Sequence, residues 1–252
     1  MNATSHNVVI LIAMRAEAQP IIDRLVMQPD MTLNQQSSPL EFFKSTLNNI
    51  NFYVVINGFC PVYGVDRVGT QAAAISAWES IRLLKPVLII NAGTAGGFTQ
   101  HNHHIGDVLL GQRVCYHDRR IPLAGFDVFG TGNYRCIVPK QLRSQLNLSL
   151  GNISTGNALD FTDTDLQIMQ ANQAHLKEME AAAIAEVAAL KNIPLMCLKA
   201  ITDFIDAPET ISHQFIKNLQ LASMNLADKL QQITEFIASR PIEALLTDDL
   251  ED

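Results

Sequence analysis

The sequence has little of what marks membrane, secreted or nucleic-acid-binding proteins. It is acidic, with a net charge of −7 and a pI near 5.4, and so lacks the basic signature of proteins that bind nucleic acids or anionic membranes. Its first apolar run, Val8–Met14, is too short for a signal-peptide core or a membrane span. We therefore expect a cytoplasmic protein that binds a small molecule, with no nucleic acid and no membrane among its partners.

Residues for metal and disulfide chemistry are also sparse. Cys60, Cys115, Cys136 and Cys197 lie far apart without a Cys-x-x-Cys pair, which fits reduced, buried thiols better than disulfides or zinc ligands. The segment His101–His104 lacks a well-spaced fourth ligand. We interpret it as a solvated turn and expect no metal site.

The glycine-rich segment Gly93–Gly97 lacks the motifs of phosphate-binding loops. It contains neither the Gly-x-Gly-x-x-Gly of dinucleotide-binding folds nor the Gly-Lys-Ser/Thr that ends a P-loop. We interpret it as a turn, which is either a plain tight turn or one whose glycines let the backbone approach a ligand closely.

Hydrophobic residues make up 48% of the chain and charged residues 17%, which suits one sizeable core, so we expect a single domain over residues 1–252. Continuous apolar runs indicate buried strands, and 3.6-residue repeats indicate helices. Together they predict the α/β class. The patterns predict strands over 8–14, 51–57, 87–91, 105–115 and 193–201, and helices over 16–25, 65–84 and 211–238, with another beginning at Glu180. They also predict a long loop over 117–132 that needs a covering partner and a frayed tail over 248–252.

Three carboxylates lie at predicted strand ends or helix starts. Glu17 falls in the first turn of a helix, Glu180 at a helix N-terminus, and Asp203 just after the strand over 193–201. Each has an ordinary structural explanation, namely compensation of the helix dipole for the glutamates and N-capping for Asp203. Side chains at such positions in an α/β sheet also converge on one cleft, where one acid can be ionised and another protonated. Hydrolysis of a glycosidic bond requires this division.

Six motifs stand in the order found in one enzyme family. They are Ala13–Glu17, Asn91–Phe98, Ile105–Val108, Ser154–Asn157, Met179–Ala183 and Thr202–Asp203. Through them the chain resembles the 5'-methylthioadenosine/S-adenosylhomocysteine nucleosidases from about Val8 to about Leu219. The segments His117–Pro122 and Lys177–Glu180 make it most similar to the plant type.

The resemblance implies a fold, an assembly and a set of roles. The fold is the nucleoside phosphorylase/nucleosidase fold, a three-layer α/β/α sandwich with a central mixed, partly barrel-like sheet. The assembly is a homodimer, with no metal and no organic cofactor. By motif position, Glu17 would activate the attacking water and Asp203 would protonate adenine at N7. The residues expected at the substrate are Met14, Thr94, Ala95, Gly96, Leu159, Asp160, Lys177, Glu178, Met179, Glu180 and Phe126.

Several of these residues have more specific expected contacts. Glu180 would hydrogen-bond the ribose hydroxyls and Met179 would pack on the sugar. Phe126 would reach the active site of a partner subunit from the loop over 117–132, and this apolar loop would suit a methylthio group better than the charged tail of S-adenosylhomocysteine.

The chain departs from the family pattern near the base. Asn157 replaces the aspartate of a Ser-Gly-Asp motif common in bacterial members, and Leu159 replaces an aromatic residue that stacks on adenine. Asn91 stands where related phosphorylases place an arginine for phosphate. Because a neutral amide cannot supply that charge-assisted contact, we expect water as the acceptor.

The expected reaction is therefore hydrolysis of 5'-methylthioadenosine, with S-adenosylhomocysteine as a second candidate, to adenine and 5-methylthioribose in methionine salvage. One alternative is another purine nucleosidase or phosphorylase of this fold, such as a futalosine hydrolase. A second is a nucleoside-binding module without catalysis, against which Glu17, Glu180 and Asp203 argue. Release of a reducing sugar with or without phosphate distinguishes the enzymes from one another.

Overall fold

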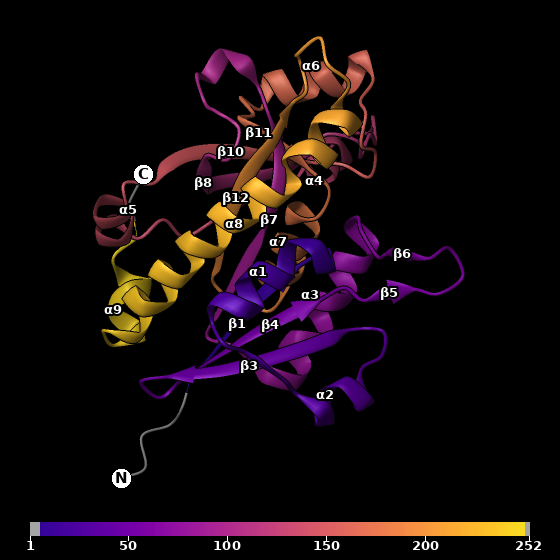
Figure 1. Ribbon diagram of the computed structural model, residues 1–252. Helices are drawn as coiled ribbons and strands as arrows, with labels where there is room; N and C mark the ends of the chain where they lie inside the picture. Colours follow the sequence, from indigo (N-terminus) through magenta and orange to yellow (C-terminus); the bar gives the residue numbers. More distant parts are fainter. Residues whose placement is uncertain (1–5, 250–252) are drawn as a thin grey trace.

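The computed structural model describes residues 6–249, in which a mixed β-sheet carries helices on both faces (Figure 1). The longer strands are β1 (His6–Ile12), β3 (Glu41–Leu47), β4 (Ile50–Ile56), β7 (Leu88–Gly97), β8 (Val108–Tyr116), β10 (Ser149–Thr155) and β12 (Leu195–Phe204). The short ones are β2 (Gln28–Pro29), β5 (Phe59–Cys60), β6 (Val65–Asp66), β9 (Tyr134–Arg135) and β11 (Leu176–Glu178). The helices are α1 (Arg15–Arg24), α2 (Met31–Gln36), α3 (Thr70–Leu84), α4 (Phe126–Thr131), α5 (Lys140–Leu146), α6 (Asp163–Ala171), α7 (Ala181–Leu190), α8 (Ile211–Ala238) and α9 (Ile242–Thr247), with a 3-10 turn η1 at Thr99–His101.

The sheet is closed at one end and open at the other. Its strands pair in the order β11-β10-β8-β12-β7-β1-β4-β3-β2, and β11 pairs a second time with β7. This second pairing closes β7, β12, β8, β10 and β11 into a barrel, while β1, β4 and β3 extend from it as an open sheet. The expected partly barrel-like sheet is confirmed.

Strand β1 illustrates how the sheet separates two hydrophobic layers. Val8, Ile10 and Ile12 belong to the core cluster that includes α1 and α8, whereas Val9 and Leu11 belong to the cluster that includes α3 and α7. Alternate residues of a strand point to opposite faces, so one apolar run is buried on both sides. Figure 1 shows α1 and α8 crossing one face of the sheet, and the sandwich of three layers is as expected.

The prediction of a turn over Gly93–Gly97 is wrong, because β7 continues to Gly97. The glycines allow close packing between neighbouring strands. A Cβ atom on Gly96 would lie 2.5 Å from Oδ2 of Asp203, and one on Gly97 would lie 3.1 Å from the ring of Phe204. Glycine inside a strand often marks such a close approach.

Other boundaries differ from the sequence-based expectation. The helix predicted over 65–84 begins only at Thr70, and residues 65–66 form β6, the return strand of a hairpin with β5. Strand β3 was not predicted. The loop over 117–132 contains the short helix α4. The helix predicted over 211–238 is confirmed in full.

The tail is anchored where the structure describes it. A carboxylate oxygen of Asp248 accepts from the backbone N–H of Gln141 at 2.8 Å, and one of Asp249 accepts from that of Val138 at 2.6 Å. The prediction of fraying is therefore wrong for these two aspartates, and residues 250–252 lie outside the described residues. Within residues 6–249, no helix combines the length and the apolar content that crossing a membrane requires.

The scarce cysteines and the histidine segment are only partly as predicted. All four thiols are free, and Cys115, Cys136 and Cys197 are buried, but Cys60 is partly exposed. The segment predicted as a solvated turn is less open than expected, because the ring of His101 stacks on that of His175 with centroids 3.9 Å apart.

Candidate active site

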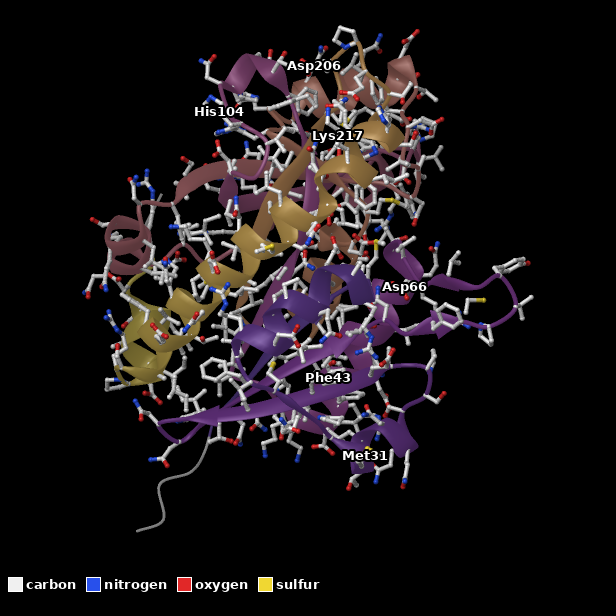
Figure 2. All side chains as sticks on the ribbon, in the orientation of Figure 1. Met31, Phe43, Asp66, His104, Asp206 and Lys217 are labelled. Atoms are coloured by element: carbon white, nitrogen blue, oxygen red, sulfur yellow. The ribbon has the colours of Figure 1, made fainter. Side chains whose placement is uncertain are left out.

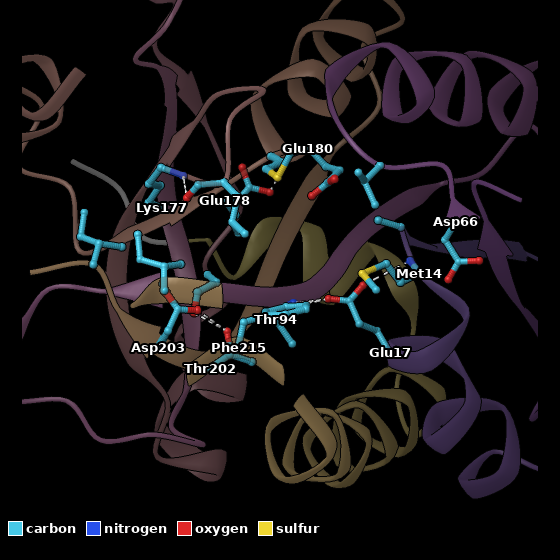
Figure 3. Close-up of a pocket in the computed structure, with 18 of the residues that line it drawn as sticks. Met14, Glu17, Asp66, Thr94, Lys177, Glu178, Glu180, Thr202, Asp203 and Phe215 are labelled. Atoms are coloured by element: carbon cyan, nitrogen blue, oxygen red, sulfur yellow. Dashed lines mark hydrogen bonds between the residues drawn. The ribbon is translucent and has the colours of Figure 1, made fainter. Parts of the chain in front are cut away.

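A cavity of about 440 Å³ opens where β1, β7 and β12 reach their carboxyl ends (Figure 3). Ligands bind in this place in many α/β proteins. The cavity is lined by Ala13, Met14, Glu17, Val65, Asp66, Val68, Thr94, Ala95, Gly96, Leu159, Lys177, Glu178, Met179, Glu180, Thr202, Asp203, Ile205, Ile211 and Phe215. We use the name cavity floor for residues 93–97, 176–180 and 199–204, and the name aromatic loop for residues 117–132.

Glu17 lies at one end of the floor, in the first turn of α1. One carboxylate oxygen accepts from both the backbone N–H and the hydroxyl of Thr94, at 2.8 and 2.6 Å, and the other accepts from the N–H of Met14 at 3.2 Å. The side chain is buried. A Cβ atom on Gly93 would lie 3.4 Å from it, so the strand leaves space for this carboxylate.

Asp203 lies at the other end of the floor, and Figure 3 shows Thr94 between the two acids. It follows a register shift in the pairing of β12 with β7, and its carboxylate accepts from the hydroxyl of Thr202 at 2.7 Å. Burial raises the pKa of Asp203, while the hydrogen bond from Thr202 and the charge of Lys177 partly oppose the rise. A carboxyl group in this setting keeps its proton to higher pH than a solvated one.

Glu178 and Glu180 are two residues apart but have different surroundings. Glu178 is buried and forms an ion pair with Lys199 at 2.9 Å, and it also accepts from the backbone N–H groups of Glu180 and Ala181. Burial raises the pKa of Glu178, but the charge of Lys199 and the hydrogen bonds from Thr155, Lys199 and Glu180 outweigh it and hold the pKa below its usual value. Its carboxylate is therefore occupied by the protein itself.

Glu180 begins α7 and accepts from the N–H of Gly69 at 2.8 Å. Burial, followed by repulsion from Glu178, raises its pKa to about 7. It has fewer protein partners than Glu178 and stands at the cavity wall beside Met179. This carboxylate is available to accept hydrogen bonds from a ligand.

Lys177 lies at the same end of the cavity as Asp203 (Figure 3). Its ammonium donates to the backbone carbonyls of Ala158 and Leu159, at 2.7 and 2.9 Å. Leu159 lines the cavity, but Asp160 and Phe126 do not line it within one chain. The structure thus brings together all the expected substrate residues except these two.

Several lining residues were not found from the sequence. Val65, Asp66 and Val68 come from the return strand of the β5–β6 hairpin and the turn after it, while Ile211 and Phe215 come from the first turns of α8. None of these five residues belongs to a recognisable sequence motif. Lys199, the ion-pair partner of Glu178, was also not predicted, because it lies inside an apolar strand. A lysine in such a run indicates a buried carboxylate partner.

The arrangement suits acid–base chemistry on a mainly apolar ligand. A buried acid with a raised pKa at one end, a hydrogen-bonded carboxylate at the other and a third acid between them can divide proton donation, proton acceptance and binding. Among residues 6–249, no three potential metal ligands converge on one point.

Comparison with known proteins gives a consistent result. The family model of the phosphorylase superfamily matches residues 7–235. A 5'-methylthioadenosine nucleosidase of Arabidopsis thaliana is 38% identical over 95% of this chain and 90% of its own length. A 5'-methylthioadenosine/S-adenosylhomocysteine nucleosidase of the same plant is 35% identical over 94% of each chain. The solved structure of the Arabidopsis thaliana 5'-methylthioadenosine nucleosidase in apo form superposes with a TM-score of 0.91 at 37% identity, covering 96% of this chain and all of that one.

Proposed function

The chain belongs to the phosphorylase superfamily, and on that premise we propose that it hydrolyses the N-glycosidic bond of 5'-methylthioadenosine to adenine and 5-methylthioribose. The observation that carries this proposal is the placement of Glu17 and Asp203 at opposite ends of one cavity, with β7 between them. Both Arabidopsis thaliana relatives are named as nucleosidases of this kind.

The proposed chemistry begins at the base. Cleavage of the bond between C1' and N9 leaves negative charge on the purine, and a proton donated to N7 neutralises it. Asp203 is suited to this step, because burial raises its pKa and so favours the protonated carboxyl more than solvent does. The hydroxyl of Thr202 fixes the orientation of the carboxyl group.

Positive charge develops on the ribose at the same time, and water attacks there. Glu17 is suited to accept a proton from this water, because Thr94 and Met14 hold its carboxylate in one orientation. Glu180 would accept from the ribose hydroxyls, and Met179 beside it would pack on the sugar. Each positioned proton transfer contributes ~10² to 10⁴ in rate.

Water is the proposed acceptor because of Asn91. This residue is buried, and its amide donates to the carbonyl of Leu11 at 3.4 Å. A neutral amide in this position cannot bind phosphate as an arginine does. The alternatives of a phosphorylase, of a futalosine hydrolase and of a module without catalysis are not favoured by the relatives.

We further propose that the protein is one domain that acts in methionine salvage in the cytoplasm as a homodimer. Phe126 and Phe129 of the aromatic loop are 54% and 55% exposed, which is costly for large apolar side chains unless a partner covers them. In a symmetric dimer this loop would close the 5' end of the partner's cavity, and an apolar closure would favour the methylthio group over the charged tail of S-adenosylhomocysteine.

An adenine-release assay tests the proposed reaction. Adenine should appear from 5'-methylthioadenosine at the same rate with and without millimolar phosphate, and more slowly from S-adenosylhomocysteine. Phosphorus NMR should detect no 5-methylthioribose 1-phosphate. Formation of that product would refute hydrolysis, and binding of the nucleoside without adenine release would support the module without catalysis.

A further inference from the structure

Lys177 and Asp203 flank the same glycine. In the sheet, Lys177 of β11 pairs with Gly96 of β7, and Asp203 of β12 pairs with Gly96 from the other side. Paired residues of neighbouring strands project from the same face of a sheet. Gly96 has no side chain, and the carboxylate of Asp203 occupies the space that a Cβ there would take. Lys177 and Asp203 therefore lie on either side of Gly96 at one end of the cavity, which both of them line.

The ammonium of Lys177 is held by carbonyl groups. The side chain is buried, and its Nζ atom donates to the carbonyls of Ala158 and Leu159 at 2.7 and 2.9 Å. A lysine ammonium has three donors, so one remains after these two bonds. Carbonyl oxygens satisfy the donors without neutralising the charge, which therefore acts on its surroundings.

The carboxylates around Lys177 show which group its ammonium interacts with most strongly. Burial lowers the pKa of Lys177, and four carboxylates oppose this in the order Asp203, Glu178, Asp160 and Asp165. Glu178 already has an ion pair with Lys199, and Asp165 one with Arg120. Conversely, the positive charge of Lys177 lowers the pKa of Asp203. The two groups are thus coupled across Gly96.

We propose that Lys177 is a positioning residue for the purine end of the cavity. It fixes the backbone of Ala158 and Leu159, against which the base would lie, and it places a positive charge opposite Asp203. This inference rests on the proposed function for the identity of the base, but the coupling between the two side chains does not require catalysis.

The coupling has a chemical use. Burial alone would favour a carboxyl group that holds its proton too firmly to donate it, because a general acid works best when its pKa is near the working pH. The positive charge of Lys177 counteracts this, and it stands where the departing purine gains negative charge. Loss of the ammonium would also leave two carbonyls without their donor, which disorders the loop that carries Leu159.

The test is a carboxyl titration of Asp203 in three lysine variants. Carbon-13 NMR of aspartate-labelled protein follows the carboxyl carbons with pH, and Asp203→Asn identifies the Asp203 signal by its disappearance. In Lys177→Met the midpoint of this signal should rise by about one pH unit, whereas Lys177→Arg should keep the parental midpoint. Lys229→Met is the matched control, because Lys229 also donates to a backbone carbonyl, that of Leu146, but does not line this cavity.

Kinetics supply the second measurement. Lys177→Met should raise KM for 5'-methylthioadenosine about tenfold, since the loop behind the base loses its two anchoring bonds, and Lys177→Arg should restore most of it. An unchanged Asp203 midpoint in folded Lys177→Met would refute the charge coupling, and an unchanged KM would refute the anchoring. If the parent protein released no adenine while Lys177→Met still raised the Asp203 midpoint, the proposed function would be refuted and the coupling supported.

Discussion

The cavity floor and the aromatic loop differ in how their functional side chains are supported. At the cavity floor, acids have hydrogen-bond or ion-pair partners from their own chain. Glu17, at one end of the floor, accepts from Thr94 and Met14, and Glu178 pairs with Lys199. The ion pairs of the aromatic loop lie near its start, where Arg119 contacts Glu186 at 2.7 Å and Arg120 contacts Asp165. Beyond that point its phenylalanines are more than half exposed. One chain therefore supports the acids of the floor by itself, whereas it leaves the phenylalanines of the loop exposed, and the proposed dimer would cover them.

The sharpest test of this contrast is Asp203→Asn. The amide still accepts from Thr202 but cannot donate a proton to N7 as a carboxylic acid does, so kcat should fall by ~10² to 10⁴ without loss of stability. Adenine release and thermal melting measure the two effects. Asp206→Asn is the control, because the exposed Asp206 accepts from Thr99 outside the cavity. Activity near the parental level in folded Asp203→Asn would remove Asp203 from the mechanism.

The next largest effect is expected from Lys199→Met, which leaves Glu178 buried without its cation. The free energy of unfolding should fall by about 3 to 5 kcal/mol, because an uncompensated buried charge is costly. Urea denaturation measures it, with Lys229→Met as a control for loss of a lysine elsewhere. The double variant Glu178→Gln/Lys199→Met should recover part of the loss. A stable Lys199→Met would mean that the floor does not depend on this ion pair.

A smaller effect concerns pH. Because the folded pKa of Glu180 is raised to about 7 from the usual 4.5, its contribution to stability is present at low pH and is lost as pH rises through about 7. The difference in free energy of unfolding between the parent and Glu180→Gln should therefore change between about pH 5 and pH 8, by at most ~3 kcal/mol. Urea denaturation at the two pH values measures it. A difference that does not change with pH would contradict the raised pKa.

The smallest effect is expected in the aromatic loop. Phe126→Ala should raise KM for 5'-methylthioadenosine by about five- to tenfold with little change in kcat, since in the proposed dimer it removes apolar surface from the 5' end of the partner's cavity and no chemical group. Met31→Ala is the control, because Met31 is also more than half exposed but lies on α2, away from the cavity (Figure 2). Sedimentation should show a dimer in both variants. A fully active monomer would refute the shared loop.

The same contrast explains what the sequence predicts well. Strand β1 and helix α8 follow simple hydrophobic periods, and Glu17 and Asp203 are fixed by their positions relative to such elements, so their places are predictable. Gly93–Gly97 was interpreted as a turn because glycine usually interrupts a strand. Here Gly96 and Gly97 leave space for the side chains of Asp203 and Phe204 on the adjacent strand. The sequence of one strand does not show which strand lies beside it.

Other features depend on contacts between distant segments. In β3 buried and exposed residues do not alternate regularly: Phe42 is buried, and the residues on both sides of it are partly exposed. The strand therefore has only a weak hydrophobic pattern in the sequence. Asp66 and Phe215 also line the cavity, but they lie far apart in the chain, and neither belongs to a sequence motif of the family. The sequence can predict that Lys199 is a buried charge, because it lies inside an apolar strand. Only the arrangement of β11 and β12 in the structure identifies Glu178 as its partner.

The pairing of β7 with both β1 and β12 has a consequence for synthesis. A growing chain makes Glu17 and Thr94 well before Asp203, and β12, which carries Asp203, is the strand that lies between β7 and β8 in the barrel. Until that strand leaves the ribosome, β7 has one open edge and the acids have no common floor. We therefore expect the complete cavity to form only after β12 has been synthesised, and a nascent chain that stops before β12 to leave unpaired the edge of β7 that β12 covers.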